Sequence, residues 1–150
     1  MSDTLRVHGR WSFRYCDATT GKERVGGVYE NQICLTGCAV LAAFLNAESP
    51  ALGLYGAVGT GTAIPVYGDT VLGAEYARVA LGSSSRASNV TSLEFFFTTS
   101  QANTTITECG AFLTATSTVN SGQLLSHALI SEVKNNTETM TIEVAVTFSA

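Results

Sequence analysis

The stretch Glu138–Ser149 reads ETMTIEVAVTFS and alternates between apolar and mostly polar residues. Because successive side chains of a β-strand point to opposite faces, this period of two predicts an amphipathic strand. One face carries Met140, Ile142, Val144, Val146 and Phe148, and the other carries Thr139, Thr141, Glu143, Ala145 and Thr147. The stretch therefore predicts a strand that packs one face against a core.

Further segments with strand character precede it. Residues 10–15 alternate, with Trp11, Phe13 and Tyr15 on one face, and a turn at residues 17–22 leads into a second extended run over residues 25–35. This order predicts a hairpin. Additional strands are predicted over residues 52–59, 76–81, 89–98, 104–113 and 123–133.

Two of these predicted strands carry expectations about orientation. Phe95, Phe96 and Phe97 are consecutive, so at least one of them is expected to point outward. In the strand over 104–113, alternation places one set of side chains on the face opposite Ile106 and Glu108; that set is Thr105, Thr107 and Cys109.

One segment has helical character. Residues 38–45 are rich in Ala and Leu, with Thr36 as the expected N-cap and Pro50 beyond the expected end. Val40, Leu41, Phe44 and Leu45 form an apolar stripe at helical spacing, expected to close one end of a β core. Seven or eight strands with one short helix predict an antiparallel β-sandwich, jelly-roll-like, in one domain over residues 1–150. Residues 1–10 are polar and are expected to be either an extended arm towards a neighbouring subunit or a frayed terminus.

Composition narrows the classes of partner. Charged residues make up only 13% of the 150 residues while hydrophobic residues make up 45%, which is not the composition of a disordered chain. The net charge of -4 argues against direct binding of nucleic acid, which requires a basic face. There is no apolar run long enough to cross a membrane, and the first residues lack the apolar core of a secretion signal. We therefore expect neither a nucleic-acid partner nor a membrane partner.

The cysteines are Cys16, Cys34, Cys38 and Cys109. Three readings stay open: buried inert thiols, a disulfide that involves Cys16 or Cys109, and zinc binding by Cys34 and Cys38, which lie four residues apart. No Cys-x-x-Cys or His-x-x-x-His pair lies nearby, so the sequence favours inert thiols and predicts neither a metal nor a cofactor.

Residues 59–78 begin with Gly59-Thr-Gly-Thr62, which resembles the start of a phosphate-binding loop. Such a loop needs a lysine that leads straight into a helix. No lysine follows here, and Pro65 interrupts the segment where the helix would begin. The segment is therefore predicted to be a turn-rich connector whose polar residues hold structure: Asp69, Thr70, Glu75 and Arg78.

Candidate catalytic groups are few. His8 and His127 are solitary in sequence, and each is expected to be a surface histidine or one whose hydrogen bonds are satisfied. Glu75 and Glu108 are considered as a glycosidase carboxylate pair, but the chain has a single tryptophan for sugar stacking, Trp11. The two glutamates are instead expected to accept hydrogen bonds from turns or to pair with Arg78 or Arg86. The prediction is that the protein is not an enzyme.

The motif order resembles that of structural proteins of tailed bacteriophages. Tail-fibre and collar-type proteins often carry Gly-Thr-Gly-Thr, Pro, Asp-Thr-x-Leu-x-x-Glu-x-x-Arg and an Ile-x-Glu-x-Gly-hydrophobic-Phe strand. This chain has the corresponding residues Gly59–Thr62, Pro65, Asp69, Thr70, Leu72, Glu75, Arg78, Ile106, Glu108, Gly110 and Phe112, followed by Gly122, Leu124 and Leu125. The segment from Trp11 to Ile33 is also similar to phage virion proteins.

The resemblance implies a structural virion component on the outside of the particle, made in the host cytoplasm. It implies that Asp69, Thr70, Glu75, Arg78 and Glu108 fix the sandwich and its connector. Because the chain is compact and poor in charge, a capsid decoration (cement) protein is the first expectation, as a homo-oligomer, with a trimer favoured, bound to the major capsid protein. A tail-fibre, collar or neck component bound to tail proteins is the alternative, and a carbohydrate-binding β-sandwich is the second alternative.

Overall fold

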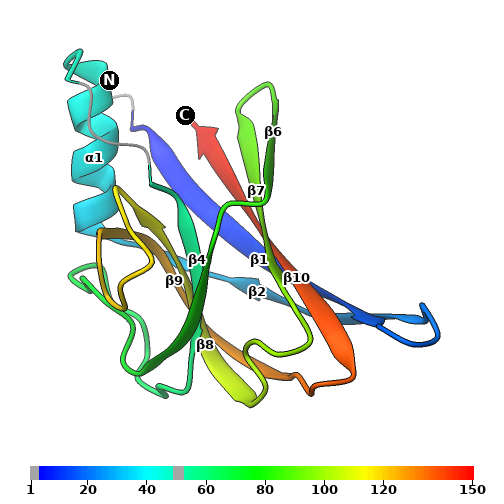
Figure 1. Ribbon diagram of the computed structural model, residues 1–150. Helices are drawn as coiled ribbons and strands as arrows, with labels where there is room; N and C mark the ends of the chain where they lie inside the picture. Colours follow the sequence, from blue (N-terminus) through cyan, green and yellow to red (C-terminus); the bar gives the residue numbers. More distant parts are fainter. Residues whose placement is uncertain (1–3, 49–52) are drawn as a thin grey trace.

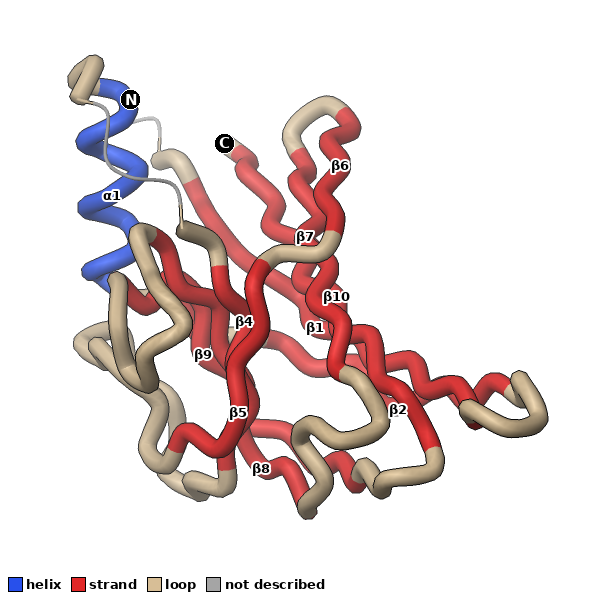
Figure 2. The backbone as a smooth tube through the Cα atoms, in the orientation of Figure 1, coloured by secondary structure: helices blue, strands red, loops and turns tan. Residues whose placement is uncertain are grey.

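The computed structural model describes residues 4–48 and 53–150, and within them the chain forms ten strands and one helix (Figures 1 and 2). The elements in chain order are β1 Arg6–Asp17, β2 Glu23–Glu30, β3 Gln32–Ile33, α1 Leu35–Leu45, β4 Tyr55–Gly59, β5 Glu75–Ala80, β6 Ser83–Ala87, β7 Val90–Phe97, β8 Thr105–Leu113, β9 Gln123–Val133 and β10 Glu138–Ser149.

The strands form two antiparallel sheets. The first sheet has the order β2-β1-β10-β7-β6, and the second has the order β3-β9-β8-β4-β5. The two sheets pack over a shared core, and α1 lies against the end of the second sheet near β9 (Figure 1). The predicted antiparallel β-sandwich with one short helix is confirmed. None of the described segments is a helix with both the length and the apolarity to cross a membrane.

The alternation in β10 is the basis of the core. Met140, Ile142, Val144 and Val146 are buried, as their spacing predicts, and β10 pairs with β1 on one side and β7 on the other. From β1, the core receives Trp11, Phe13 and Tyr15. The indole Nε1 of Trp11 donates to Ser126 Oγ of β9 at 2.9 Å, so one buried hydrogen bond links the sheets. Trp11 is therefore a core residue that presents no surface for stacking on a sugar.

The three consecutive phenylalanines of β7 are oriented as the pleat requires. Phe95 and Phe97 are fully buried, whereas Phe96 is 50% exposed. The prediction that at least one of them points outward is confirmed.

Two predictions about the region before residue 46 are wrong. The expected single strand over 25–35 is divided into β2 and β3, which belong to different sheets. The helix begins at Leu35 instead of residue 38, and its N-cap is Cys34, whose side chain makes no cap hydrogen bond. Thr36, the expected cap, instead donates its hydroxyl to the carbonyl of Leu124 at 2.9 Å. The helix start is thus fixed by contact with β9, because tertiary packing overrides a local cap signal.

The expected facing of side chains in β8 is also wrong, for a reason that matters to the site. The register with β9 shifts between Ile106 and Glu108, which is the signature of a β-bulge. Ile106 and Cys109 consequently both belong to the main core, although alternation places them on opposite faces. Glu108 is directed to the outer face of the second sheet, where it contacts the β4–β5 connection.

The segment 1–10, expected as an arm or a frayed end, is described only in part. Residues 6–10 are the first residues of β1 and pair with β10, while residues 1–3 lie outside the described part of the chain. The strand predicted over 52–59 is β4, Tyr55–Gly59, and Leu52 also lies outside the described residues.

Candidate functional site

The connection between β4 and β5, residues 60–74, is called the connector here. It crosses the outer face of the second sheet, and its Leu72 packs in a small buried cluster with Phe112 and Leu124. The sequence predicts a structural role for the polar residues of this region. The structure places Asp69, Glu75 and Arg78, together with Glu108, in two separate clusters of charged groups, and it leaves Thr70 outside both.

Glu108 is the centre of the first cluster. Its carboxylate accepts backbone N–H groups of the connector: Gly61 to Oε1 at 2.9 Å, Gly73 to Oε2 at 2.9 Å and Ala74 to Oε1 at 2.7 Å. Burial raises the pKa of this carboxyl, but the hydrogen bonds from Ala74, Gly73, His127 and Gly61 outweigh burial and bring the pKa below its ordinary value. Glu108 is therefore held as a carboxylate that ties both ends of the connector to β8.

His127 extends this cluster from β9. Its Nε2 lies 2.9 Å from Glu108 Oε2, and its Nδ1 lies 2.8 Å from Asp69 Oδ2. Asp69 Oδ2 also accepts the backbone N–H of Val66 at 2.8 Å. Each ring nitrogen of His127 therefore lies within hydrogen-bond distance of a carboxylate oxygen, one from β8 and one from the connector. The contact between His127 and Asp69 thereby fixes the middle of the connector, in addition to the two ends that Glu108 binds.

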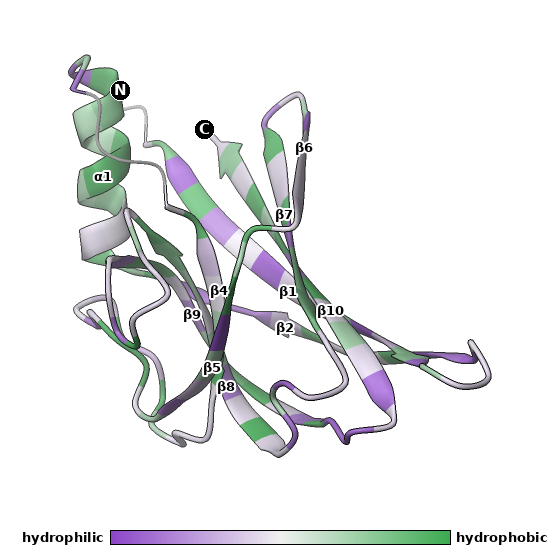
Figure 3. Cartoon of the chain, in the orientation of Figure 1, coloured by the Kyte–Doolittle hydropathy of each residue, from purple (hydrophilic) through white to green (hydrophobic). Residues whose placement is uncertain are grey.

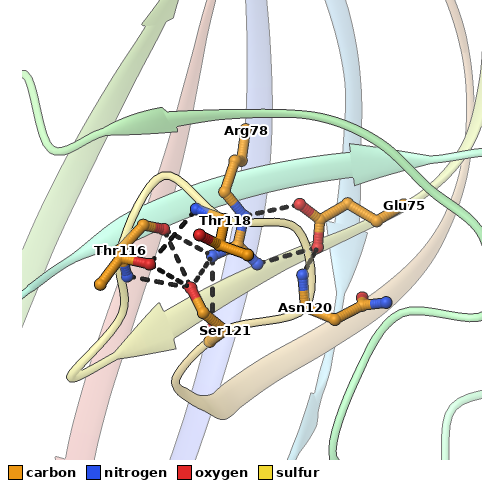
Figure 4. Close-up of polar contacts among 6 residues, drawn as sticks. All are labelled: Glu75, Arg78, Thr116, Thr118, Asn120 and Ser121. Carbon is orange, nitrogen blue, oxygen red and sulfur yellow. Dashed lines mark hydrogen bonds and ion pairs between the residues drawn. The ribbon is translucent and has the colours of Figure 1, made fainter.

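The second cluster joins Glu75 and Arg78 of β5 (Figure 4). The guanidinium donates through Nε to Glu75 Oε1 at 2.6 Å and through Nη2 to Glu75 Oε2 at 2.8 Å, a two-point contact between nearly buried groups. The Arg78 Cζ atom also lies 4.6 Å from the ring centroid of Phe112, in a cation–π contact.

This pair holds the loop between β8 and β9, residues 114–122. Arg78 Nη1 donates to the carbonyls of Thr116 at 2.9 Å and Ser121 at 3.2 Å, and to Ser121 Oγ at 3.0 Å. Glu75 Oε2 accepts the backbone N–H of Asn120 at 3.1 Å. Figure 4 shows how the loop residues converge on the ion pair. The ion pair thus provides hydrogen-bond partners for backbone groups of a loop that has no regular secondary structure.

The predicted site residues divide between these clusters. Asp69 and Glu108 meet through His127, and Glu75 pairs with Arg78. Arg86 is not part of either cluster, because it donates to the carbonyl of Ser88. Thr70 is exposed, and no hydrogen bond of its side chain is found among the described residues. Sequence reasoning did not identify His127 as a cluster member.

Glu75 and Glu108 do not form a carboxylate pair. Glu108 binds the connector and His127, whereas Glu75 binds Arg78 and Asn120, so the two share no partner in the described structure. Over residues 4–48 and 53–150, no group of three or more His, Cys, Asp or Glu side chains is arranged to hold a metal ion. Asp69 and Glu108 bind opposite nitrogens of His127 and therefore do not converge on one point.

The cysteines of the described chain are all free thiols. Cys34 and Cys109 are buried, and burial raises the pKa of Cys34 to about 12 and that of Cys109 well above its ordinary value. Because the thiolate is the reactive form, both groups are inert at neutral pH. Cys16 and Cys38 are half-buried.

The glycines at the start of the connector are explained by Glu108. A Cβ added at Gly59 or at Gly61 would clash with Oε1 of that residue. The pattern that resembles a phosphate-binding loop therefore leaves room for a carboxylate of the protein itself.

The connector also carries exposed apolar side chains. Ile64 is 79% exposed, and Val66 and Tyr67 are more than half exposed. Apolar side chains on a loop whose backbone is fixed from beneath are typical of an interaction surface. We call these three residues, together with the partly exposed Val71, the connector patch.

Comparison with protein-family models, with curated proteins and with solved structures gave no match to this chain.

Proposed function

We propose that the protein is a non-enzymatic structural protein of a bacteriophage virion, of the capsid decoration type, which binds the outside of the head shell and stabilises it. The observation that carries this proposal is the connector patch, whose apolar side chains project from a loop fixed by Glu108, His127 and Asp69. The resemblance of the sequence motifs to those of phage structural proteins is the reason for naming a phage particle.

Anchoring of the connector favours binding over chemistry. Three backbone N–H groups and His127 occupy the Glu108 carboxylate, and both nitrogens of His127 face carboxylates. A general acid or base needs a free hydrogen-bonding position towards a substrate, and here those positions are engaged within the protein.

Rigidity is what the proposed role requires. A loop that is already ordered does not lose conformational entropy on binding, so more of the contact energy appears as affinity. A cement protein gains its stabilising effect from buried apolar area repeated over many copies on the shell, and not from turnover. The connector patch meets this requirement with four apolar side chains on one loop.

The test uses purified particles from which the protein has been removed, to which wild type and variants are added back. Ile64→Asp is expected to reduce binding by at least about tenfold, because it places a charge in the centre of an apolar contact. Val25→Asp is the matched control, because Val25 has the same 79% exposure but lies on β2. Equal binding of both variants to the shell would contradict the role of the connector patch.

Electron microscopy of native particles tests the location. Hundreds of copies over the head support the decoration role, whereas a few to tens of copies at the tail or neck favour the alternative, a tail-fibre, collar or neck component. Absence of the protein from the particle would refute both.

A further inference from the structure

Lys134 is a buried lysine that belongs to neither of the two clusters. It directly follows β9 and is only 2% exposed, although the turn between β9 and β10, residues 134–137, is hydrophilic (Figure 3). Lysine is almost never fully buried unless it is paired with an opposite charge. In the part of the chain that the structure describes, however, Lys134 forms no ion pair.

The hydrogen-bond partners of the Lys134 amine are neutral. Its Nζ donates to the side-chain Oδ1 of Asn103 at 2.8 Å and to the carbonyl of Asn135 at 3.2 Å. An ammonium has three N–H donors, whereas a neutral amine has two donors and a lone pair, so the two acceptors match the neutral amine. Burial favours the same form and lowers the pKa of Lys134, although the charge of Glu138 acts in the opposite direction. The neutral amine is the nucleophilic form of lysine.

Asn103 presents its carboxamide to this amine in a fixed orientation. It lies between β7 and β8, and its Nδ2 donates to the carbonyl of Thr99 at 2.8 Å, which leaves Oδ1 facing Lys134. The backbone also holds the two residues together, because the N–H of Lys134 donates to the carbonyl of Thr104 at 3.1 Å. Both side chains are thus positioned where β8 begins and β9 ends, on adjacent strands of the second sheet.

The amine nitrogen lies close to the carbonyl carbon of the carboxamide. A C=O bond is about 1.2 Å long, so a nitrogen 2.8 Å from Oδ1 is no more than about 4.0 Å from Cγ of Asn103. Groups that are placed to react have their reacting atoms about 3–3.5 Å apart. A movement of at most about 1 Å therefore brings Nζ to Cγ. Such placement gives effective concentrations of up to about 10⁵–10⁸ M, and the reaction has to occur only once in each chain.

We propose that Lys134 and Asn103 form an isopeptide bond within the folded chain. Nζ attacks Cγ of Asn103 and a new C–N bond forms, while the bond between Cγ and Nδ2 breaks. The proton that Nζ loses goes to the departing nitrogen, which leaves as ammonia, so atoms and electrons balance without an oxidant or reductant. The product joins the segment before β8 covalently to the residue after β9. This inference is independent of the proposed function.

The first test is the intact mass of the purified full chain, kept folded at mildly alkaline pH and then denatured. Wild type is expected to be lighter than its sequence mass by about 17 Da, the mass of one ammonia. Lys134→Met and Asn103→Ala are each expected to have their full sequence mass. Lys22→Met is the matched control, because Lys22 is the only other lysine in the sequence and is exposed, and this variant is expected to keep the deficit.

Digestion with trypsin distinguishes the isopeptide bond from a succinimide, which an asparagine forms with its own backbone and which also releases ammonia. Trypsin cuts an unmodified chain after Arg86 and Lys134, which gives residues 87–134 and 135–150. An acylated lysine is not cut, so residues 87–150 are expected as one peptide, with the cut after Lys22 as the internal standard. A wild type with its full sequence mass, or complete cutting after Lys134, would overturn the inference. Both results are obtained on wild type, so they hold even where a variant does not fold.

Discussion

His127 and Glu108 lie on adjacent strands with Nε2 2.9 Å from Oε2, and both side chains are almost completely buried. The contact is directly linked to three backbone N–H groups of the connector, which also bind Glu108. One carboxylate, at the register shift between β8 and β9, therefore contacts a histidine in β9 and both ends of the β4–β5 connection.

Replacement of Glu108 with Gln is expected to destabilise the fold by about 3 kcal/mol. An amide presents N–H groups where the carboxylate accepts hydrogen bonds, which leaves buried backbone donors without partners. The measurement is urea denaturation at neutral pH. Glu30→Gln is the control: Glu30 forms an exposed ion pair with Arg10, and such a pair contributes at most about 1 kcal/mol. Similar losses of stability in the two variants would show that Glu108 contributes no more to stability than an exposed ion-pair residue.

Acid should weaken the same anchor. The pKa of Glu108 is lower in the folded protein than the ordinary value of 4.5. A carboxyl with a depressed pKa contributes stability above its unfolded pKa, and this contribution is lost as pH falls through the folded pKa. The stability difference between wild type and Glu108→Gln is therefore expected to shrink as pH falls from 4.5. Urea midpoints measured at a series of pH values test this, and a difference that stays constant down to pH about 2 would contradict it.

Glu143 is expected to show the opposite dependence. It lies directly opposite Glu94 across β10 and β7, and burial and the charge of Glu94 raise its pKa. A raised carboxyl pKa means that the folded state is destabilised as pH rises above 4.5 through the folded pKa.

Replacement of Glu143 with Gln should thus increase stability at pH 7 by about 0.5 kcal/mol and have little effect well below pH 4.5. Thermal denaturation at both pH values is the measurement. Glu23→Gln, at an exposed position of β2, is the control, and equal gains from both substitutions would exclude the cross-strand explanation.

Arg78→Lys is expected to loosen the loop over residues 114–122 while the sandwich stays folded. A lysine keeps the charge but cannot reproduce the two-point contact with Glu75 together with the bonds to Thr116 and Ser121. Hydrogen exchange should become faster at the Thr116 and Asn120 amides, with a stability loss of about 2 kcal/mol. Arg86→Lys provides the comparison, because Arg86 makes one exposed contact with the Ser88 carbonyl. Unchanged exchange in Arg78→Lys would show that the loop is held by other contacts.

Alternating patterns predicted the strands whose two faces have different surroundings. β10 has the predicted bounds, and burial alternates along most of it. β9 also has the predicted bounds, although residues 124–128 are all buried. The five residues of β6, by contrast, are all exposed, so no alternation marks them as a strand. The start of α1 was also missed, because it depends on Gly37 and Thr36 meeting β9 rather than on a local cap.

The candidate site was predictable only as a set of residue types. The connector glycines and acids indicated a structural segment, but the partner of Asp69 lies 58 residues away in sequence. The register shift between β8 and β9 at residues 106–108 breaks the expected alternation in β8, so alternation alone gave no reason to place Glu108 beside His127. The period of two in a single sequence does not mark where such a register shift occurs.

Gly61→Ala tests whether the connector requires a glycine at residue 61 in particular. A Cβ at Gly61 would clash with Glu108 Oε1, so the carboxylate or the loop must shift and weaken hydrogen bonds to buried donors. We expect a loss of about 2 kcal/mol in the free energy of unfolding. Gly68→Ala in the same connector is the matched control, because a Cβ there meets no atom within 4 Å.

Gly68→Ala should be neutral or stabilise by about 0.5 kcal/mol, since it reduces the entropy of the unfolded chain. In the double variant Gly61→Ala, Glu108→Gln, the loss in the free energy of unfolding should be smaller than the sum of the losses in the two single variants, because both substitutions act on one carboxylate. Full additivity would mean that Gly61 is required for some contact other than the one with Glu108.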